Sequence, residues 1–156
     1  GCYDRMTIQH LVDLCFLKSD VRQSHAMFVI DVDNFKNYND KYGHANGDLC
    51  LKHFAATMKK CFPKDSILGR YGGDEFVVYI KNAASDDAHR YMDEFQREIS
   101  HLMMSGGEYV TVSASAGGVA FIGEGEDFVS LCRSADNMLY DVKRNGKGTF
   151  KMKGAK

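Results

Sequence analysis

The chain reads RYGGDEFVVYI from Arg70 to Ile80, and this stretch decides the predicted fold. Two glycines and two carboxylates separate two runs with the composition of β-strands, which indicates a hairpin with a polar turn. Glycine reaches backbone angles that other residues adopt only with strain, and it leaves no side chain between the main chain and a ligand. Asp74 and Glu75 stand at the edge of this turn, where they could hold a cation against that ligand.

A second acidic pair, Asp31 and Asp33, follows the apolar run Met27–Ile30. Because this run is continuously apolar rather than alternating, it predicts a buried central strand over 26–31. Two buried strands that end in carboxylates are typical of the divalent-metal sites of nucleotide-processing enzymes. Taken alone, a Gly-Gly-Asp-Glu turn is more often a polar hairpin without a ligand, and Asp33 fits a structural role as well as a ligand role.

Bulk composition narrows the class of protein. The 156 residues suffice for a substantial core, and 44% apolar and 26% charged residues are ordinary for a globular domain. A formal net charge of −1 gives no electrostatic argument for binding nucleic acid. The five cysteines include no Cys-x-x-Cys pair, which predicts reduced thiols. Since neither a membrane-length apolar run nor a signal peptide is visible, we expect a cytoplasmic domain without direct membrane contact.

We expect residues 1–156 to form one domain, because a single proline and the absence of repeats argue against an internal linker. The abrupt start at a predicted helix suggests excision from a longer sensor protein. Periodicity predicts helices over 7–19, 47–60, 86–104 and 127–144, and strands over 26–31, 66–71, 76–81, 110–121 and 148–153. Helices interleaved with a mostly antiparallel sheet predict an α+β sandwich. His53, His89 and His101 fall on predicted helices, where surface or packing roles are expected.

Several motifs in order resemble the GGDEF domain family, the catalytic domains of bacterial diguanylate cyclases. Besides residues 70–80, they are the stretch from Asp31 to Asp48, the start at Asp4–Thr7 and the segment Lys143–Lys147. The resemblance therefore covers nearly the whole chain. It implies a ferredoxin-like, palm-type sandwich related to the catalytic domains of class III nucleotide cyclases, with strand 26–31 beside the hairpin.

The resemblance implies two Mg²⁺ ions in each active site, with Mn²⁺ able to substitute. Asp31, Asp74 and the carbonyl of Val32 would be the metal ligands, and Lys36 would stabilise charge in the transition state. Asp74 is also the family's usual acceptor of the 3′-hydroxyl proton. Because metal binding makes a carboxylate a poorer base, Glu75 and solvent remain alternatives for this role.

The family pattern also implies residues that contact GTP. Backbone amides of Asn34 and Phe35 would bind phosphate, while the Phe35 ring packs in the core. Asn39 and Asp48 would pair with guanine, and the carboxylate of Asp48 favours guanine at both positions of the product. The remaining expected contacts are His44, which shapes the pocket, Gly72 and Gly73 at the turn, and Lys143 and Lys147 near the distal phosphates, with Lys147 where arginine is more usual.

The implied activity joins two GTP molecules into cyclic di-GMP and two pyrophosphates at a homodimer interface, under an upstream sensory or dimerisation domain. Two alternatives stay open: a catalytically silent GTP-binding regulatory module, and an intramolecular cyclase that makes cyclic GMP. The chain departs from the family pattern at Ile8 and Leu11, where Gly and Asn are usual. It also reads Pro63–Ser66 in the register of the family's Arg-x-x-Asp inhibitory site, so we expect no inhibitory site.

Overall fold

The computed structural model describes residues 2–18, 23–122 and 127–154. No helix in these ranges has the length and apolar character needed to cross a bilayer. The elements in chain order are α1 (Arg5–Lys18), β1 (Ser24–Val32), α2 (Phe35–Tyr42), α3 (His44–Cys61), β2 (Ile67–Arg70), β3 (Glu75–Ile80), α4 (Ser85–Ile99), β4 (His101–Met103), β5 (Tyr109–Thr111), β6 (Ala114–Ile122), α5 (Phe128–Arg144) and β7 (Phe150–Lys153).

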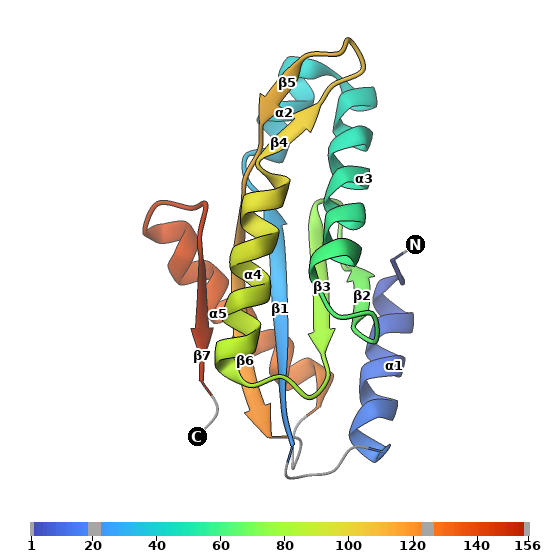
Figure 1. The fold of residues 1–156 in the computed structure, drawn as a ribbon, viewed down its shortest axis with the longest axis vertical. Helices are drawn as coiled ribbons and strands as arrows, with labels where there is room; N and C mark the ends of the chain where they lie inside the picture. The colour runs from blue at the N-terminus through green and yellow to red at the C-terminus, as the bar shows by residue number, and fades with distance from the viewer. Residues whose placement is uncertain (1, 19–22, 123–126, 155–156) are drawn as a thin grey trace.

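The central sheet has the strand order β2-β3-β1-β6-β7. Neighbouring strands are antiparallel except for β6 and β7, which run parallel. Strands β4 and β5 form a separate hairpin that extends beyond one end of the sheet (Figure 1). The predicted α+β class with a mostly antiparallel sheet is confirmed.

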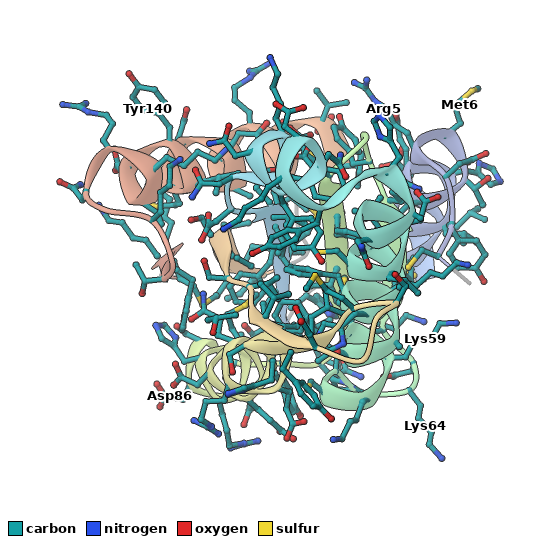
Figure 2. All side chains as sticks on the ribbon, turned by 90° about the horizontal axis from the view of Figure 1, so that it is seen from above. Arg5, Met6, Lys59, Lys64, Asp86 and Tyr140 are labelled. Carbon is teal, nitrogen blue, oxygen red and sulfur yellow. The ribbon has the colours of Figure 1, made fainter. Side chains whose placement is uncertain are left out.

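The sheet lies between two layers of helices. Along β1, Phe28 and Ile30 face the core under α3 and α4, whereas Met27 and Val29 face the core under α1 and α5. Figure 2 shows the same division from above, with Met6 and Tyr140 on the side of α1 and α5, and Lys59 and Asp86 on the side of α3 and α4. Because both faces of β1 are covered, the strand is continuously apolar until the carboxylate at its end.

Helix α5 packs directly on strand β6 because Gly117 has no side chain. A Cβ atom built at Gly117 would lie 2.0 Å from the carbonyl oxygen of Ala135 and 2.2 Å from the amide nitrogen of Leu139. Any larger residue would therefore push the helix backbone away from the sheet. This close approach sets the position of Lys143 in the last turn of α5.

One predicted helix and one predicted strand were wrong in their extent. Helix α4 ends at Ile99 rather than 104, and His101 begins strand β4 instead of lying on a helix. The predicted strand 110–121 is divided into β5 and β6. Gly107 adopts φ +85° in the connection between β4 and β5, where its amide donates to the carbonyl of Met104. Leu102 and Met103 fit both the helical and the strand spacing of apolar residues, and pairing with β5 selects the strand.

Helix α2 is a further element that the sequence pattern did not predict. It follows β1 after two residues and is separated from α3 by Gly43, which adopts φ +87°. None of its eight residues is fully buried, so it lacks a strong apolar stripe. The other predicted elements agree within a few residues, although Ser19, the predicted end of the first helix, lies outside the described residues.

His25 of β1 is buried and held neutral. It is 1% exposed, packs against the rings of Tyr79 and Phe121, which also contact each other, and accepts a hydrogen bond at Nδ1 from the amide of Asn82 at 3.0 Å. Burial lowers its pKa below the usual 6.5. Below that pH the unfolded chain binds a proton that the folded chain resists, so stability is lost as pH falls.

We therefore expect the unfolding free energy to fall between pH 7 and pH 5, with His25 contributing at most about 1.4 kcal/mol per pH unit. Urea unfolding of the wild type and His25→Gln at both pH values measures this contribution. The glutamine can accept the Asn82 hydrogen bond but cannot titrate, so its stability should change less. Equal pH dependence in the two proteins would rule out His25 as the source.

Candidate active site

Pairing of β1 with β3 brings the two acidic segments together. Asp31 lies directly opposite Glu75 in the antiparallel register, and the amide of Val32 donates to the carbonyl of Asp74 at 3.2 Å. Directly opposed residues place their side chains on the same face of a sheet. Asp31 and Glu75 therefore face the α5 side, as the prediction of adjacent strands requires.

Two lysines from the end of α5 and the loop after it meet these residues. The Lys143 ammonium donates a hydrogen bond to one carboxylate oxygen of Asp31, and the Lys147 ammonium donates to the Asn34 side chain at 3.0 Å. A cavity of about 300 Å³ opens here. Its walls are formed by Asp31, Val32, Asp33, Asn34, Phe35, Lys36, Asn37, Asp74, Lys143 and Lys147.

Asp31 carries the most constrained carboxylate of the site. Its residue is 5% exposed, and its second oxygen, Oδ1, is buried without a hydrogen-bond partner among the described residues. Burial raises the pKa of Asp31; the Lys143 hydrogen bond opposes this effect, and the charges of Asp74 and Asp33 reinforce it. The unpaired carboxylate oxygen is a suitable ligand for a hard divalent cation, although the Lys143 ammonium occupies the other oxygen.

Glu75 is half-buried beside Asp31 and Asp74. Burial, followed by repulsion from these two carboxylates, raises the pKa of Glu75. A carboxylate with a raised pKa is a stronger base once ionised, so this environment suits a proton acceptor. Lys143 has the opposite balance: burial alone would lower its pKa, but the hydrogen bond and charge of Asp31 raise it.

Asp33, whose role the sequence left open, is engaged in structural hydrogen bonds. Its two carboxylate oxygens accept from the hydroxyls of Ser113 and Ser115, each at 2.6 Å. The Ser115 hydroxyl in turn accepts from the amide of Gly148 at 3.0 Å. Asp33 thus connects the end of β1 to the start of β6 and to the loop that carries Lys147.

The start of α2 forms the opposite wall of the cavity. Asn34 precedes the helix in a left-handed conformation, with φ 54° and ψ 35°, and its side chain makes no capping hydrogen bond. The amides of the first turn are therefore available to an anion, as expected at a helix N-terminus. The Phe35 ring packs against the core, in agreement with its prediction, while Lys36 is exposed at the cavity.

Asp48 lines a second cavity, of about 280 Å³, whose other walls are Cys2, Leu51, Lys52, Ala55, Arg70 and Phe76. Asn39 lies against Gly47, the residue before Asp48, where α2 and α3 are in contact. A Cβ atom built at Gly47 would approach the Asn39 side-chain oxygen to 1.7 Å, and this oxygen is buried without a partner in the described part of the chain. His44 is exposed at the start of α3.

The glycine turn differs from the expected conformation. Neither Gly72 nor Gly73 adopts a positive φ, because the connection is four residues long rather than a tight pair. The fold itself leaves room at Gly73, where a Cβ atom would meet nothing within 4 Å, so the absence of a side chain there leaves the turn accessible to a ligand. The Arg70 side chain donates to the carbonyls of Gly72 and Gly73 at 3.3 and 2.7 Å, a role that sequence reasoning missed.

Asp136 is another residue that sequence reasoning missed. Burial, and then repulsion from Asp31, raise the pKa of Asp136. Its carboxylate therefore interacts electrostatically with the carboxylate at the end of β1. The sequence could have indicated this residue. Asp136 precedes Lys143 by seven positions, and residues i and i+7 lie on the same face of a helix.

The fold and this edge define a class of protein: palm-type α+β domains in which carboxylates and lysines meet at the end of a central strand pair. Within that class, the family described as "Diguanylate cyclase, GGDEF domain" matches residues 2–149, and the chain belongs to this family.

Relatives and a solved structure show the range of proteins that carry such a domain. Diguanylate cyclase A of Treponema denticola is 32% identical over 127 residues, which are 81% of this chain and 34% of that protein. Cyclic di-GMP phosphodiesterase PdeR of Escherichia coli is 30% identical over 150 residues, which are 96% of this chain and 22% of that protein. The GGDEF domain of TpbB (YfiN) from Pseudomonas aeruginosa superposes with a TM-score of 0.90 at 27% identity, covering 97% of this chain and 90% of that one. The chain thus spans about a third or less of the curated relatives.

Proposed function

We propose that this domain condenses two GTP molecules into cyclic di-GMP and two pyrophosphates. The observation that carries the proposal is the convergence of Asp31, Asp74 and Lys143 on one cavity, within a member of the GGDEF family. Acidic oxygens suit metal-bound phosphates, and lysines and free helix amides suit the phosphates themselves.

Asp31, Asp74 and the carbonyl of Val32 would hold two Mg²⁺ ions, or Mn²⁺ in their place. The unpartnered, buried Asp31 oxygen supports this fit. No three His, Cys, Asp or Glu side chains gather as a complete metal cage in the described ranges, and Mg²⁺ characteristically takes few protein ligands and the rest from phosphate and water. Bound there, the ions would neutralise phosphate charge.

The chain's own residues would perform the remaining tasks. Lys36 and the amides of Asn34 and Phe35 bind and orient phosphate oxygens. Glu75, with its raised pKa, accepts the proton from the attacking 3′-hydroxyl. Lys143 and Lys147 would bind the distal phosphates, and Lys143 would exchange its contact with Asp31 for a phosphate oxygen.

One site holds one GTP, so the reaction requires two domains face to face. Each 3′-oxygen attacks the α-phosphorus held by the partner, and each pyrophosphate leaves. We propose that residues 1–156 are one unit of a longer protein in which an upstream sensory or dimerisation domain pairs two copies. The greater length of the relatives supports this arrangement.

A silent GTP-binding regulatory module is the second candidate, because one relative is named a phosphodiesterase rather than a cyclase. Incubation with GTP and Mg²⁺, followed by mass spectrometry of the products, separates the candidates. Cyclic di-GMP supports the proposed activity, unchanged GTP supports the silent module, and cyclic GMP indicates an intramolecular cyclase. The test should use a high concentration of the domain so that dimerisation is not limiting.

Guanine recognition by Asn39 and Asp48 leads to a test of specificity. We expect Asn39→Ala and Asp48→Ala each to weaken GTP binding by about 1–3 kcal/mol, because guanine donors or acceptors stay unpaired, while ATP binding changes little. Isothermal titration calorimetry with both nucleotides measures the difference. Asp40→Ala, on the exposed side of α2, is the matched control. Unchanged GTP affinity in both variants would place the base elsewhere.

Product inhibition through the family's usual site should be absent. Pro63 supplies no guanidinium, and Ser66 supplies no carboxylate, in the short turn where the Ser66 amide donates to the Pro63 carbonyl at 2.9 Å. We expect the double variant Pro63→Arg, Ser66→Asp to gain sensitivity to added cyclic di-GMP in steady-state assays. Noncompetitive inhibition of the wild type that this double variant leaves unchanged would contradict the prediction.

A further inference from the structure

The segment before α1 is docked on the edge of the central sheet. Tyr3 forms a parallel bridge with Gly69: its amide donates to the carbonyl of Leu68 at 2.9 Å, and its carbonyl accepts from the amide of Arg70 at 2.8 Å. Asp4 then caps α1, because its side chain accepts from the amide of Thr7 at 2.8 Å. The chain entering α1 is therefore fixed to β2.

Two contacts from α1 itself reinforce this attachment. A Cβ atom at Gly69 would lie 2.6 Å from the Ile8 side chain, so the absence of a side chain at Gly69 lets Ile8 of α1 pack directly on β2. The Arg5 guanidinium lies 4.4 Å from the centre of the Tyr71 ring, a cation–π contact. Tyr71 is the first residue of the turn that leads to Asp74, so the start of α1 contacts both β2 and the turn.

Arg70 joins this docked segment to the glycine turn. Its amide binds Tyr3, while its guanidinium binds the carbonyls of Gly72 and Gly73, with the shorter contact at 2.7 Å. On the other side of the turn, the amides of Tyr71 and Gly72 donate to the carbonyl of Glu75 at 2.8 and 3.3 Å. Hydrogen bonds from a charged donor are stronger than neutral ones, so Arg70 contributes to closing this turn alongside the two backbone bonds to Glu75.

The same segment also forms part of the second cavity. Cys2 and Arg70 line it together with Asp48, the residue proposed to recognise guanine. Displacement of residues 2–5 would therefore change the shape of this cavity and release both backbone hydrogen bonds that Tyr3 makes to β2.

We propose that residues 2–5 act through Arg70 as a positioning unit for the nucleotide site, an inference that rests on the proposed function. The unit holds the Gly72–Gly73 turn in the shape that presents Asp74 and Glu75, and it completes one wall of the guanine cavity. Arg70 is a positioning residue, since it binds the turn and not the reacting atoms. Movement of the chain that leads into α1 consequently changes nucleotide affinity in the same domain, in addition to any effect on pairing of two domains.

Hydrogen exchange of the Tyr71 and Gly72 amides, without nucleotide, tests the first half of the proposal. Arg70→Gln and Tyr3→Pro should accelerate exchange of these amides by about tenfold, because each removes a hydrogen bond that closes the unit. Arg70→Lys keeps a charged donor without the planar fork and should give a smaller change. Tyr3→Ala retains the backbone amide, and Arg90→Gln removes an exposed arginine of α4, so both should match the wild type.

Calorimetry with GTP, together with kcat and KM, tests the second half. Arg70→Gln should weaken GTP binding by about tenfold and lower kcat, and Arg70→Lys should partly restore both. Unchanged exchange at Tyr71 and Gly72 in Arg70→Gln overturns the proposal, even if Tyr3→Pro does not fold. The exchange measurement needs no turnover. If the wild type makes no cyclic di-GMP, but the variants still exchange the Tyr71 and Gly72 amides faster than the wild type, the proposed activity is contradicted and the positioning unit is supported.

Discussion

Replacement of Asp31 or Asp74 by asparagine is expected to abolish formation of cyclic di-GMP. Each substitution removes one negative charge from an edge proposed to hold two divalent cations, and an amide oxygen is a much weaker ligand for Mg²⁺ than a carboxylate. We expect turnover to fall by about a hundredfold to a thousandfold, on the scale seen when a charge-stabilising group is removed from an active site. Mass spectrometry of the products at saturating GTP measures this loss.

The same variants should remain folded. Burial raises the pKa of Asp31, which means that the folded state disfavours the charged form of this carboxyl group. A neutral amide at this position should therefore not lower the melting temperature. Asp93→Asn, an exposed carboxylate of α4, controls for the loss of charge alone. Near-normal rates in either variant would show that the two-metal assignment is wrong.

The second large effect concerns protein concentration. We expect the isolated domain to be a poor enzyme whose specific activity rises with its own concentration, because each GTP must meet the α-phosphorus held by another copy. Joining two modules raises their effective concentration to about the millimolar range. Initial rates measured across a hundredfold dilution, with the oligomeric state followed by light scattering, test this dependence.

A parallel coiled coil fused ahead of Tyr3 should restore activity, provided that its register lets the two sites face each other. Fusions lengthened by one, two and three residues rotate the attached domains in steps, and they serve as matched controls for the register. Specific activity that stays constant on dilution, in a protein verified as monomeric, would exclude the half-site arrangement.

One error in the sequence prediction occurred where the spacing of apolar residues fits both a helix and a strand. Leu102 and Met103 continue the apolar spacing of α4, yet they form strand β4 because strand β5 offers a pairing partner. Helix α2 was missed because its eight residues carry almost no apolar stripe. Its helical state is favoured by Asn34 before it, Gly43 after it and packing of Phe35 and Tyr38 on the core.

Local sequence alone determined the acidic strand ends, the hairpin and the family, because strand period, glycine and carboxylate spacing are properties of neighbouring residues. It therefore predicted Asp31, Asp74 and Lys143 as site residues, but not how they meet. The meeting of Lys143 with Asp31 depends on α5, whose backbone at Ala135 and Leu139 packs directly on Gly117 of β6.

Only the tertiary structure decided the roles of Asp33 and Arg70. Asp33 binds serines 80 and 82 residues later, and the Arg70 amide binds Tyr3 across the sheet edge. These contacts join segments that are far apart in the sequence, and neither residue spacing nor a motif indicates that they meet. Their geometry arises only when β1, β6 and the segment before α1 assemble on one sheet. The local sequence thus predicts which residue types form the site, whereas the packing of the fold determines where their side chains lie.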